Sequence, residues 1–215
     1  MQKHQFTLYH YWRSSCSWRI RWALNFKGLA YKSVSINLLK NEHTTPEFLK
    51  KSPSGYIPCL TINGQSATES IAILEWLEEV YPLPALLPSS AEDKLAVRRL
   101  VQTISSGIQP IQNLAVLQYV KKDPADRPEF ARYWIDRGLK VYEQLIRHSA
   151  GTFSLGSQIS LADLCLIPQV YNAYRYGVDM NSLPLVNRIY HNALATPACQ
   201  AALPENQPDA VKTGA

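Results

Sequence analysis

The hydrophobic positions in the first 80 residues change their period several times, and each change predicts a different element. Strict alternation of apolar and polar residues indicates β-strands, whereas apolar positions three or four apart indicate amphipathic helices. The pattern predicts strands at residues 6–9, 31–36, 59–62 and 65–67 and helices at residues 18–27, 46–51 and 70–79. Gly28 ends the first helix, and Asn63-Gly64 forms the turn between the last two strands. The order β-α-β-α-β-β-α predicts an α/β fold of the thioredoxin type.

Beyond residue 90 the apolar positions keep a helical period. Amphipathic helices are predicted at residues 91–120, 128–148, 161–174 and 183–194, and Pro110 is expected to kink the first of them. Three prolines crowd residues 81–90, which predicts a linker. We therefore expect a thioredoxin-like domain at residues 1–80, a linker at residues 81–89 and an all-α domain at residues 90–215. The polar tail at residues 204–215 is expected to be loosely ordered.

The charge of the chain indicates which classes of binding partner to expect. The net charge is +5, and residues 1–51 hold nine Lys or Arg against two Asp or Glu, an excess that favours anionic small molecules. The basic residues form no stripe with interleaved aromatics, so nucleic-acid binding is not expected. The chain has no apolar run of about 18 residues, and residues 1–5 lack the apolar core of a secretory signal. Neither membrane association nor secretion is expected, and cytoplasmic residence is the default.

The four cysteines fall into two kinds. Three lie among apolar or small residues and are interpreted as small buried hydrophobes, namely Cys59, Cys165 and Cys199. No Cys-x-x-Cys pair and no Cys/His spacing suits a metal, so no metal site is expected. Cys16 differs, because it follows Ser14 and Ser15 at the start of the first predicted helix. Unpaired N–H groups and the positive end of the helix dipole favour a thiolate there. Taken alone, the segment suggests that the Cys16 thiol is the nucleophile.

Two further positions predict ligand contacts, and a third predicts a structural role. Pro58 stands at the mouth of a strand, where a cis Ile57–Pro58 bond would expose the Ile57 backbone to an extended, peptide-like ligand. Glu69 and Ser70 begin the next helix, with Ser70 as the predicted N-cap, and the first-turn N–H groups there suit a ligand carboxylate. Capping alone is the competing interpretation. The Ser-x-x-Asp pattern at residues 160–163 predicts a capping box that anchors a buried helix.

Together these residues carry a resemblance to a known family. The run Tyr11-Trp12-Arg13-Ser14-Ser15-Cys16-Ser17-Trp18-Arg19-Ile20-Arg21-Trp22-Ala23-Leu24 closely resembles the signature of zeta-class glutathione transferases, S-S-C-x-W-R-V-R-I-A-L. The run Ser54-Gly55-x-Ile57-Pro58 is similar to the cis-proline loop of the superfamily, and residues 107–114 are typical of the class. The class includes maleylacetoacetate isomerase and bacterial maleylpyruvate isomerases. The resemblance spans nearly the whole chain and implies a glutathione transferase fold.

The resemblance implies a role for each matching residue. Ser14 would donate its hydroxyl to the glutathione sulfur, while Ser15 and Cys16 would line the same pocket, with Cys16 modulating rather than essential. The other residues implied in glutathione binding are Ile57 and Pro58, Glu69 and Ser70, and Gln109 from the helical domain. Glu69 replaces the usual Gln, and its carboxylate would attract the γ-glutamyl ammonium but repel the neighbouring carboxylate.

The resemblance also implies roles for four further positions. His43 either contacts the glycine carboxylate of glutathione or is a solvated loop histidine. Arg175 either binds a substrate carboxylate or is a surface charge. Trp12 and Arg13 are expected beside the substrate, with Trp12 as an apolar wall and Arg13 as a cation.

The implied chemistry is glutathione-dependent cis–trans isomerisation of maleylacetoacetate or maleylpyruvate in aromatic or tyrosine catabolism. A thiolate adds to the alkene, the C–C bond rotates and the thiolate leaves, so glutathione acts as a cofactor. The alternatives are conjugation or dehalogenation of α-halo acids at the same site, thiol–disulfide exchange through Cys16, and a non-catalytic interaction module. The expected partners are a small dicarboxylate substrate and a second copy of the chain in a homodimer.

Overall fold

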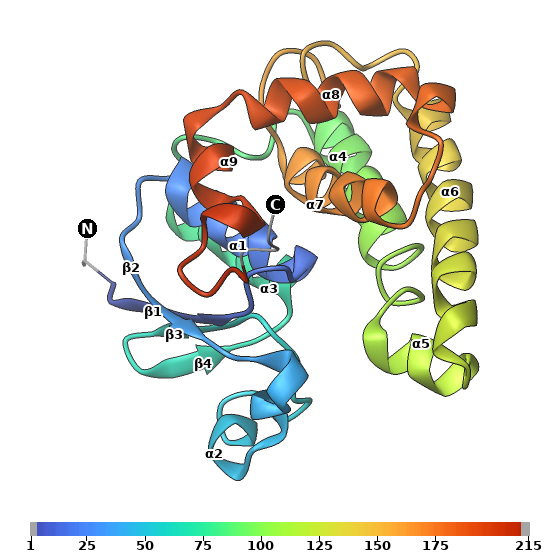
Figure 1. Cartoon of the computed structure of the whole chain (residues 1–215). Helices are drawn as coiled ribbons and strands as arrows, with labels where there is room; N and C mark the ends of the chain where they lie inside the picture. Colours follow the sequence, from blue (N-terminus) through green and yellow to red (C-terminus); the bar gives the residue numbers. More distant parts are fainter. Residues whose placement is uncertain (1–3, 212–215) are drawn as a thin grey trace. The chain divides into compact units, whose positions relative to one another are not determined.

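The computed structural model describes residues 4–211, which pack as two units (Figure 1). The first unit contains the described residues up to Pro84 together with those from Thr196 onward, and the second contains residues 85–195. The expected boundary near residue 81 lies close to the observed one. The C-terminal segment, however, belongs to the first unit rather than to the helical one.

The first unit is a four-stranded mixed sheet with helices. Its elements are β1 (Phe6–His10), α1 (Ser15–Phe26), β2 (Tyr31–Ser35), α2 (Pro46–Leu49), β3 (Cys59–Ile62), β4 (Gln65–Ala67) and α3 (Ser70–Val80), with the short 3-10 helices η1 (Leu38–Lys40) and η2 (Glu42–Thr44) before α2. The strand order is β2-β1-β3-β4, with β1 parallel to β2 and antiparallel to β3, and β4 antiparallel to β3. The predicted element order and the thioredoxin-like fold are confirmed.

Helix α1 is buried on most of its surface and organises this unit. Trp18, Ile20, Trp22 and Leu24 are all at most 1% exposed. The helix packs against α3 and also against α9 (Pro197–Ala202), as Figure 1 shows for the red α9 beside the blue α1. Covering by both α3 and α9 explains why residues 17–24 are all buried, although a helix with a single apolar stripe would expose one side. Gly28 takes a φ of 66° just after the helix, a conformation that glycine adopts without steric cost.

The C-terminal segment is ordered as far as the structure describes it, so the expectation of a loose tail is wrong for residues 204–211. Gln207 is buried, and its side-chain amide donates to the carbonyls of Ala201 (3.0 Å) and Leu203 (2.8 Å). Pro204 is buried as well, in the 3-10 helix η5 (Pro204–Asn206). These contacts offset the polar composition on which the prediction was based. Residues 212–215 lie outside the described part of the chain.

The second unit is helical. Its helices are α4 (Ala91–Ser105), α5 (Leu114–Val120), α6 (Arg127–Leu145), α7 (Leu161–Arg175) and α8 (Pro184–Leu194), with the 3-10 helices η3 (Pro124–Asp126) and η4 (Met180–Ser182). The described residues of this unit form no strand, only an isolated bridge between Ala150 and Gly156. An all-α domain is therefore confirmed for residues 85–195.

One helix prediction in this unit is wrong. Residues 91–120 form two helices rather than one helix kinked at Pro110. The first ends at Ser105, residues 106–112 form turns, and Asn113 caps the second helix by accepting a hydrogen bond from Ala115 N (3.1 Å). Pro110 lacks the backbone N–H that a continuous helix requires, and Asn113 offers a new start three residues later. The break therefore has local causes.

The predicted capping box is observed. Asp163 accepts hydrogen bonds from Ser160 N (2.8 Å) and Ser160 Oγ (2.9 Å), and also from Ser154 N (2.8 Å). Residues 81–89 contain no helix or strand. Their first part is held by Lys27, whose ammonium donates to the carbonyls of Tyr81 (2.6 Å) and Pro84 (2.9 Å). No helix among the described residues is long and apolar enough to cross a membrane.

Candidate functional site

The segment singled out by its serines and cysteine lies at the start of α1. Ser14 is the N-cap, and its Oγ accepts a hydrogen bond from Ser17 N (3.2 Å). Within residues 4–211, the N–H groups of Ser15 and Cys16 have no partner, and neither has the hydroxyl hydrogen of Ser14. All three residues are partly exposed. The helix start therefore presents two backbone donors and one hydroxyl donor, together with the positive end of the dipole, to any anion placed there.

A buried arginine joins this helix start to that of α3. The guanidinium of Arg19 is 1% exposed, and its Nη1 donates to Cys16 Sγ (3.6 Å) and to Ser70 Oγ (3.2 Å). The structure thus brings together Cys16 and Ser70, which are 54 positions apart in the sequence. Both belong to the set that the sequence analysis assigned to glutathione.

The start of α3 differs from the sequence-based prediction in its N-cap residue. Glu69, rather than Ser70, occupies the N-cap position, and Ser70 is the first helical residue. Glu69 is exposed, makes no capping hydrogen bond with its side chain, and has φ 65° and ψ 101°. A non-glycine residue with such a positive φ costs roughly 1–3 kcal/mol, and such residues cluster at binding sites. The Ser70 hydroxyl accepts from Arg19 in place of the expected capping contact.

The proline loop has the expected conformation. The Ile57–Pro58 peptide is cis. Among the described residues, neither the N–H nor the C=O of Ile57 makes a hydrogen bond. An extended peptide ligand can pair its own backbone with a residue whose N–H and C=O are both open. Pro58 is buried beneath it, and the preceding turn is closed by Ser52 Oγ, which donates to Tyr56 O (2.8 Å).

His43 lies against the same loop. A Cβ placed on Gly55 would stand 3.1 Å from the carbonyl oxygen of His43, so the two backbones are in close approach. The His43 Nδ1 atom is buried and has no hydrogen-bond partner in the described part of the chain. A buried, unpartnered ring nitrogen fits a histidine that awaits a ligand better than a solvated one. Contact with the glycine carboxylate therefore remains our prediction.

The basic excess of the N-terminal part is less exposed than its composition suggests. Arg19, Arg21 and Lys27 are all buried, and Lys27 forms an ion pair with Glu78 at 2.7 Å. Arg13 is partly exposed and stacks on the buried indole of Trp12, with 5.4 Å from its Cζ to the ring centroid. Trp12 and Arg13 therefore form a stacked pair directly before Ser14. The side chains of Arg19, Arg21 and Lys27 lie in the interior instead.

A polar cluster behind Trp12 was not found by sequence reasoning. Arg21 is fully buried and donates to the carbonyls of Trp12 (2.9 Å) and Ala202 (3.0 and 3.1 Å) and to His10 Nδ1 (3.2 Å). Since a guanidinium cannot accept, Nδ1 is the acceptor, and Nε2–H of His10 donates to Ser33 Oγ (2.6 Å). The Trp12 N–H donates to Asp209 Oδ2 (3.1 Å). Arg21 belongs to the zeta-class signature and Trp12 stands two residues before its start, but that signal does not reveal their distant partners.

This cluster predicts acid sensitivity. Burial, with the Arg21 charge, lowers the pKa of His10 to about 4 from 6.5, although Asp209 opposes the shift. Between pH 4 and pH 6.5 the His10 ring is protonated in the unfolded chain but neutral in the native state. The free energy of unfolding therefore falls as the pH drops from 6.5 towards 4. The expected loss is up to about 3 kcal/mol. Urea unfolding followed by tryptophan fluorescence reports mainly on the first unit, which holds Trp12, Trp18, Trp22 and Trp76.

The matched variants are His10→Gln and His148→Gln. The first is expected to flatten this pH dependence, because it removes the titrating ring. The second replaces an exposed histidine of the helical unit and should leave the slope unchanged. Equal slopes for wild type and His10→Gln between pH 4 and 6.5 would contradict the assignment.

The other three cysteines are confirmed as buried, each 0% exposed. Burial raises the pKa of Cys199 to about 12, although a hydrogen bond from Trp18 opposes the rise, and burial also raises the pKa of Cys59. Both thiols are therefore held protonated at neutral pH. Cys16 is the one partly exposed thiol among the described residues.

Gln109 and Arg175 belong to the second unit. Gln109 is partly exposed in the turn between α4 and α5, where its N–H donates to Ile104 O (2.9 Å). Arg175 is the last residue of α7 and is exposed, with its guanidinium 5.0 Å from the ring centroid of Tyr176. Stacking on an aromatic ring leaves the edge of a guanidinium open to a carboxylate.

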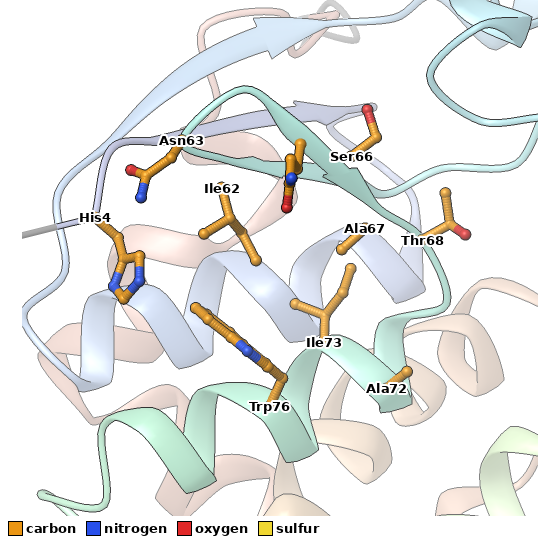
Figure 2. Close-up of a pocket in the computed structure, with 10 residues that line it drawn as sticks. His4, Ile62, Asn63, Ser66, Ala67, Thr68, Ala72, Ile73 and Trp76 are labelled. Atoms are coloured by element: carbon orange, nitrogen blue, oxygen red, sulfur yellow. The ribbon is translucent and has the colours of Figure 1, made fainter.

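A separate hollow of about 670 Å³ lies between the β3–β4 hairpin and α3. Figure 2 shows the Trp76 indole below Ile62, with His4 and Asn63 at one end and Thr68 at the other. None of the residues that line it belongs to the predicted site, so the hollow does not enlarge that site. Among the described residues, no group of three or more His, Cys, Asp or Glu could hold a metal ion.

Comparisons with known proteins identify the relatives of this chain. Residues 8–85 match the family model "Glutathione S-transferase, N-terminal domain". A probable maleylacetoacetate isomerase 2 of Drosophila melanogaster is 44% identical over 94% of this chain and 89% of its own length. A holo structure of a bacterial maleylpyruvate isomerase of the zeta class is 37% identical, with a TM-score of 0.93 over 95% of this chain and 100% of that chain. A maleylacetoacetate isomerase from Anaeromyxobacter dehalogenans with bound glutathione is 41% identical, with a TM-score of 0.90 over 98% and 100% of the two chains.

Proposed function

Because this chain belongs to the family of maleylacetoacetate isomerases and zeta-class glutathione transferases, we propose that it catalyses the glutathione-dependent cis–trans isomerisation of maleylacetoacetate or maleylpyruvate. The observation that carries the proposal is the start of α1, where Ser15 N–H, Cys16 N–H and the Ser14 hydroxyl are open donors within the described part of the chain. These three donors and the helix dipole stabilise a thiolate, and this stabilisation involves neither a metal ion nor a second cysteine.

The residues present fit glutathione. Ile57 offers an unpaired N–H and C=O for the cysteinyl unit, and the start of α3 at Glu69 and Ser70 offers helix N–H groups for the γ-glutamyl carboxylate. His43 offers a buried ring nitrogen for the glycine carboxylate. When bound, glutathione supplies a thiolate that adds to the substrate alkene, permits rotation and leaves unchanged. Ser14 holds that sulfur as the anion by donating its hydroxyl hydrogen.

The substrate is an enediketo acid with two carboxylate-bearing ends. We assign Arg175 to one substrate carboxylate, because its guanidinium is exposed and stacked. Arg13 on the Trp12 ring is assigned to the substrate as a second cation, Trp12 as its apolar support, and Gln109 to glutathione. We also propose a homodimer, to be tested by sedimentation equilibrium, and cytoplasmic residence, to be tested by cell fractionation.

The deciding experiment is spectrophotometric. The purified chain is expected to isomerise maleylacetoacetate or maleylpyruvate only when glutathione is present, and glutathione should be recovered in full. No glutathione-dependent isomerisation of either compound would reject the proposal. Chloride release from dichloroacetate in that case would favour the α-halo acid alternative, which uses the same thiolate. Absence of glutathione binding by calorimetry would favour a non-catalytic interaction module.

A further inference from the structure

The turn that carries Ser14 is closed by its own backbone. Ser14 N donates to Tyr11 O (3.0 Å), so residues 11–14 form a β-turn with Trp12 and Arg13 at its centre. The direction in which Ser14 leaves this turn sets where its hydroxyl points.

The central residue Trp12 is held on both sides by charged side chains. Arg21, from α1 itself, donates a hydrogen bond to the Trp12 carbonyl (Nη2 to O, 2.9 Å). Asp209, from the C-terminal segment, accepts a hydrogen bond from the Trp12 N–H (Oδ2 to N, 3.1 Å). Arg21 also donates to Ala202 O, at the end of α9. Trp12 is therefore tied directly to Asp209 and, through Arg21, to Ala202.

The Asp209 carboxylate makes this one hydrogen bond within residues 4–211, while its charge also acts on Arg21 and His10. Its Oδ1 is buried without a hydrogen-bond partner, and no ion pair involving it is present in that part of the chain. A half-buried carboxylate with one hydrogen bond stabilises a fold only weakly, because desolvation offsets most of the gain. Its contact with the peptide two residues before Ser14 gives it a more specific role.

We propose that Asp209 is a positioning residue that fixes the Trp12 peptide and thereby aims the Ser14 hydroxyl at the sulfur of bound glutathione. The inference rests on the proposed function, since it assigns Ser14 to that sulfur. A misplacement of about 1 Å in a group that contacts the reacting atom costs up to about 10²-fold in rate. The Asp209 hydrogen bond is one of the two side-chain contacts that hold the Trp12 backbone in this turn.

The test measures the thiol pKa of glutathione in its binary complex with the full chain, from the ultraviolet absorbance of the thiolate. Asp209→Ala is expected to raise that pKa by about one unit and to lower kcat for isomerisation about tenfold, with a smaller change in the KM for glutathione. Asp209→Asn keeps an oxygen acceptor for the Trp12 N–H and is expected to retain the wild-type thiol pKa. Glu205→Ala removes an exposed carboxylate from the same segment and serves as the matched control.

Two results would overturn the proposal. One is a wild-type thiol pKa in Asp209→Ala, even with a lowered melting temperature, because a purely structural role moves only the latter. The other is an Asp209→Asn variant as impaired as Asp209→Ala. If Asp209→Ala does not fold, Asp209→Glu displaces the acceptor by one methylene and must still raise the thiol pKa. The binary complex needs no substrate, so a chain that binds glutathione but isomerises nothing rejects the proposed function and leaves this test intact.

Discussion

Ser14→Ala is expected to lower kcat/KM for glutathione-dependent isomerisation by about 10²- to 10³-fold. The loss follows from the open donor of the Ser14 hydroxyl at the start of α1, because one hydrogen bond to a developing or stable anion in a shielded site contributes about that factor. The same change should raise the thiol pKa of bound glutathione. Initial rates and a spectral titration of the thiolate measure the two effects.

Two control variants separate chemistry from folding. Ser14→Ala also removes an N-cap, which costs about 1 kcal/mol. Ser90→Ala removes an equivalent cap from α4, where Ser90 Oγ accepts from Asp93 N (3.0 Å), and should lower stability without lowering the rate. Cys16→Ala should reduce the rate less than tenfold. If Cys16→Ala abolishes activity and Ser14→Ala does not, thiol–disulfide exchange through Cys16 replaces the isomerase mechanism.

Asp163→Ala is expected to destabilise the helical unit by about 3–4 kcal/mol. The carboxylate is fully buried and satisfies two backbone N–H groups and one hydroxyl, so its removal leaves three buried donors without an acceptor. Burial raises the pKa of Asp163, while its hydrogen bonds with Ser154 and Ser160 lower it. Urea unfolding followed by far-ultraviolet circular dichroism measures the loss.

Asp179→Ala is the matched control for this prediction. Asp179 is exposed, belongs to the same unit and also caps a helix, by accepting from Asn181 N (3.0 Å). Its removal should cost less than about 1 kcal/mol, because water replaces the lost contact. Equal losses for the two variants would show that the cap itself, rather than buried donors, determines the effect.

The elements that the sequence predicted correctly are those with local causes. The alternation in β1 and β2, the glycine after α1 and the Ser160–Asp163 box are each readable within a few residues. The cis Ile57–Pro58 bond was expected from the family resemblance, since base rates alone argue against it. The break at residues 106–113 was missed, although Pro110 and Asn113 were visible, because the helical period continues across it.

Contacts between distant residues set the limit of prediction. Arg21 bonds Ala202 across 181 positions, and Trp12 bonds Asp209 across 197. No periodicity in the sequence pairs such residues, and the polar composition of the tail argued against order there. Part of the basic excess of residues 1–51 is also hidden, since Arg19, Arg21 and Lys27 find their partners in the interior. The unusual φ of Glu69 had no local signal either.

The return of the C-terminal segment to the first unit has a consequence for how the protein is made. Residues 4–84 are synthesised first and residues 85–195 next, yet α9, which covers α1, is synthesised only after both. Until then Trp18 and Trp22 lack one of their two covering helices, and the peptide before Ser14 lacks Asp209 and Ala202. The unit that carries the N-terminal signature therefore cannot reach its final form until the whole helical unit has been synthesised.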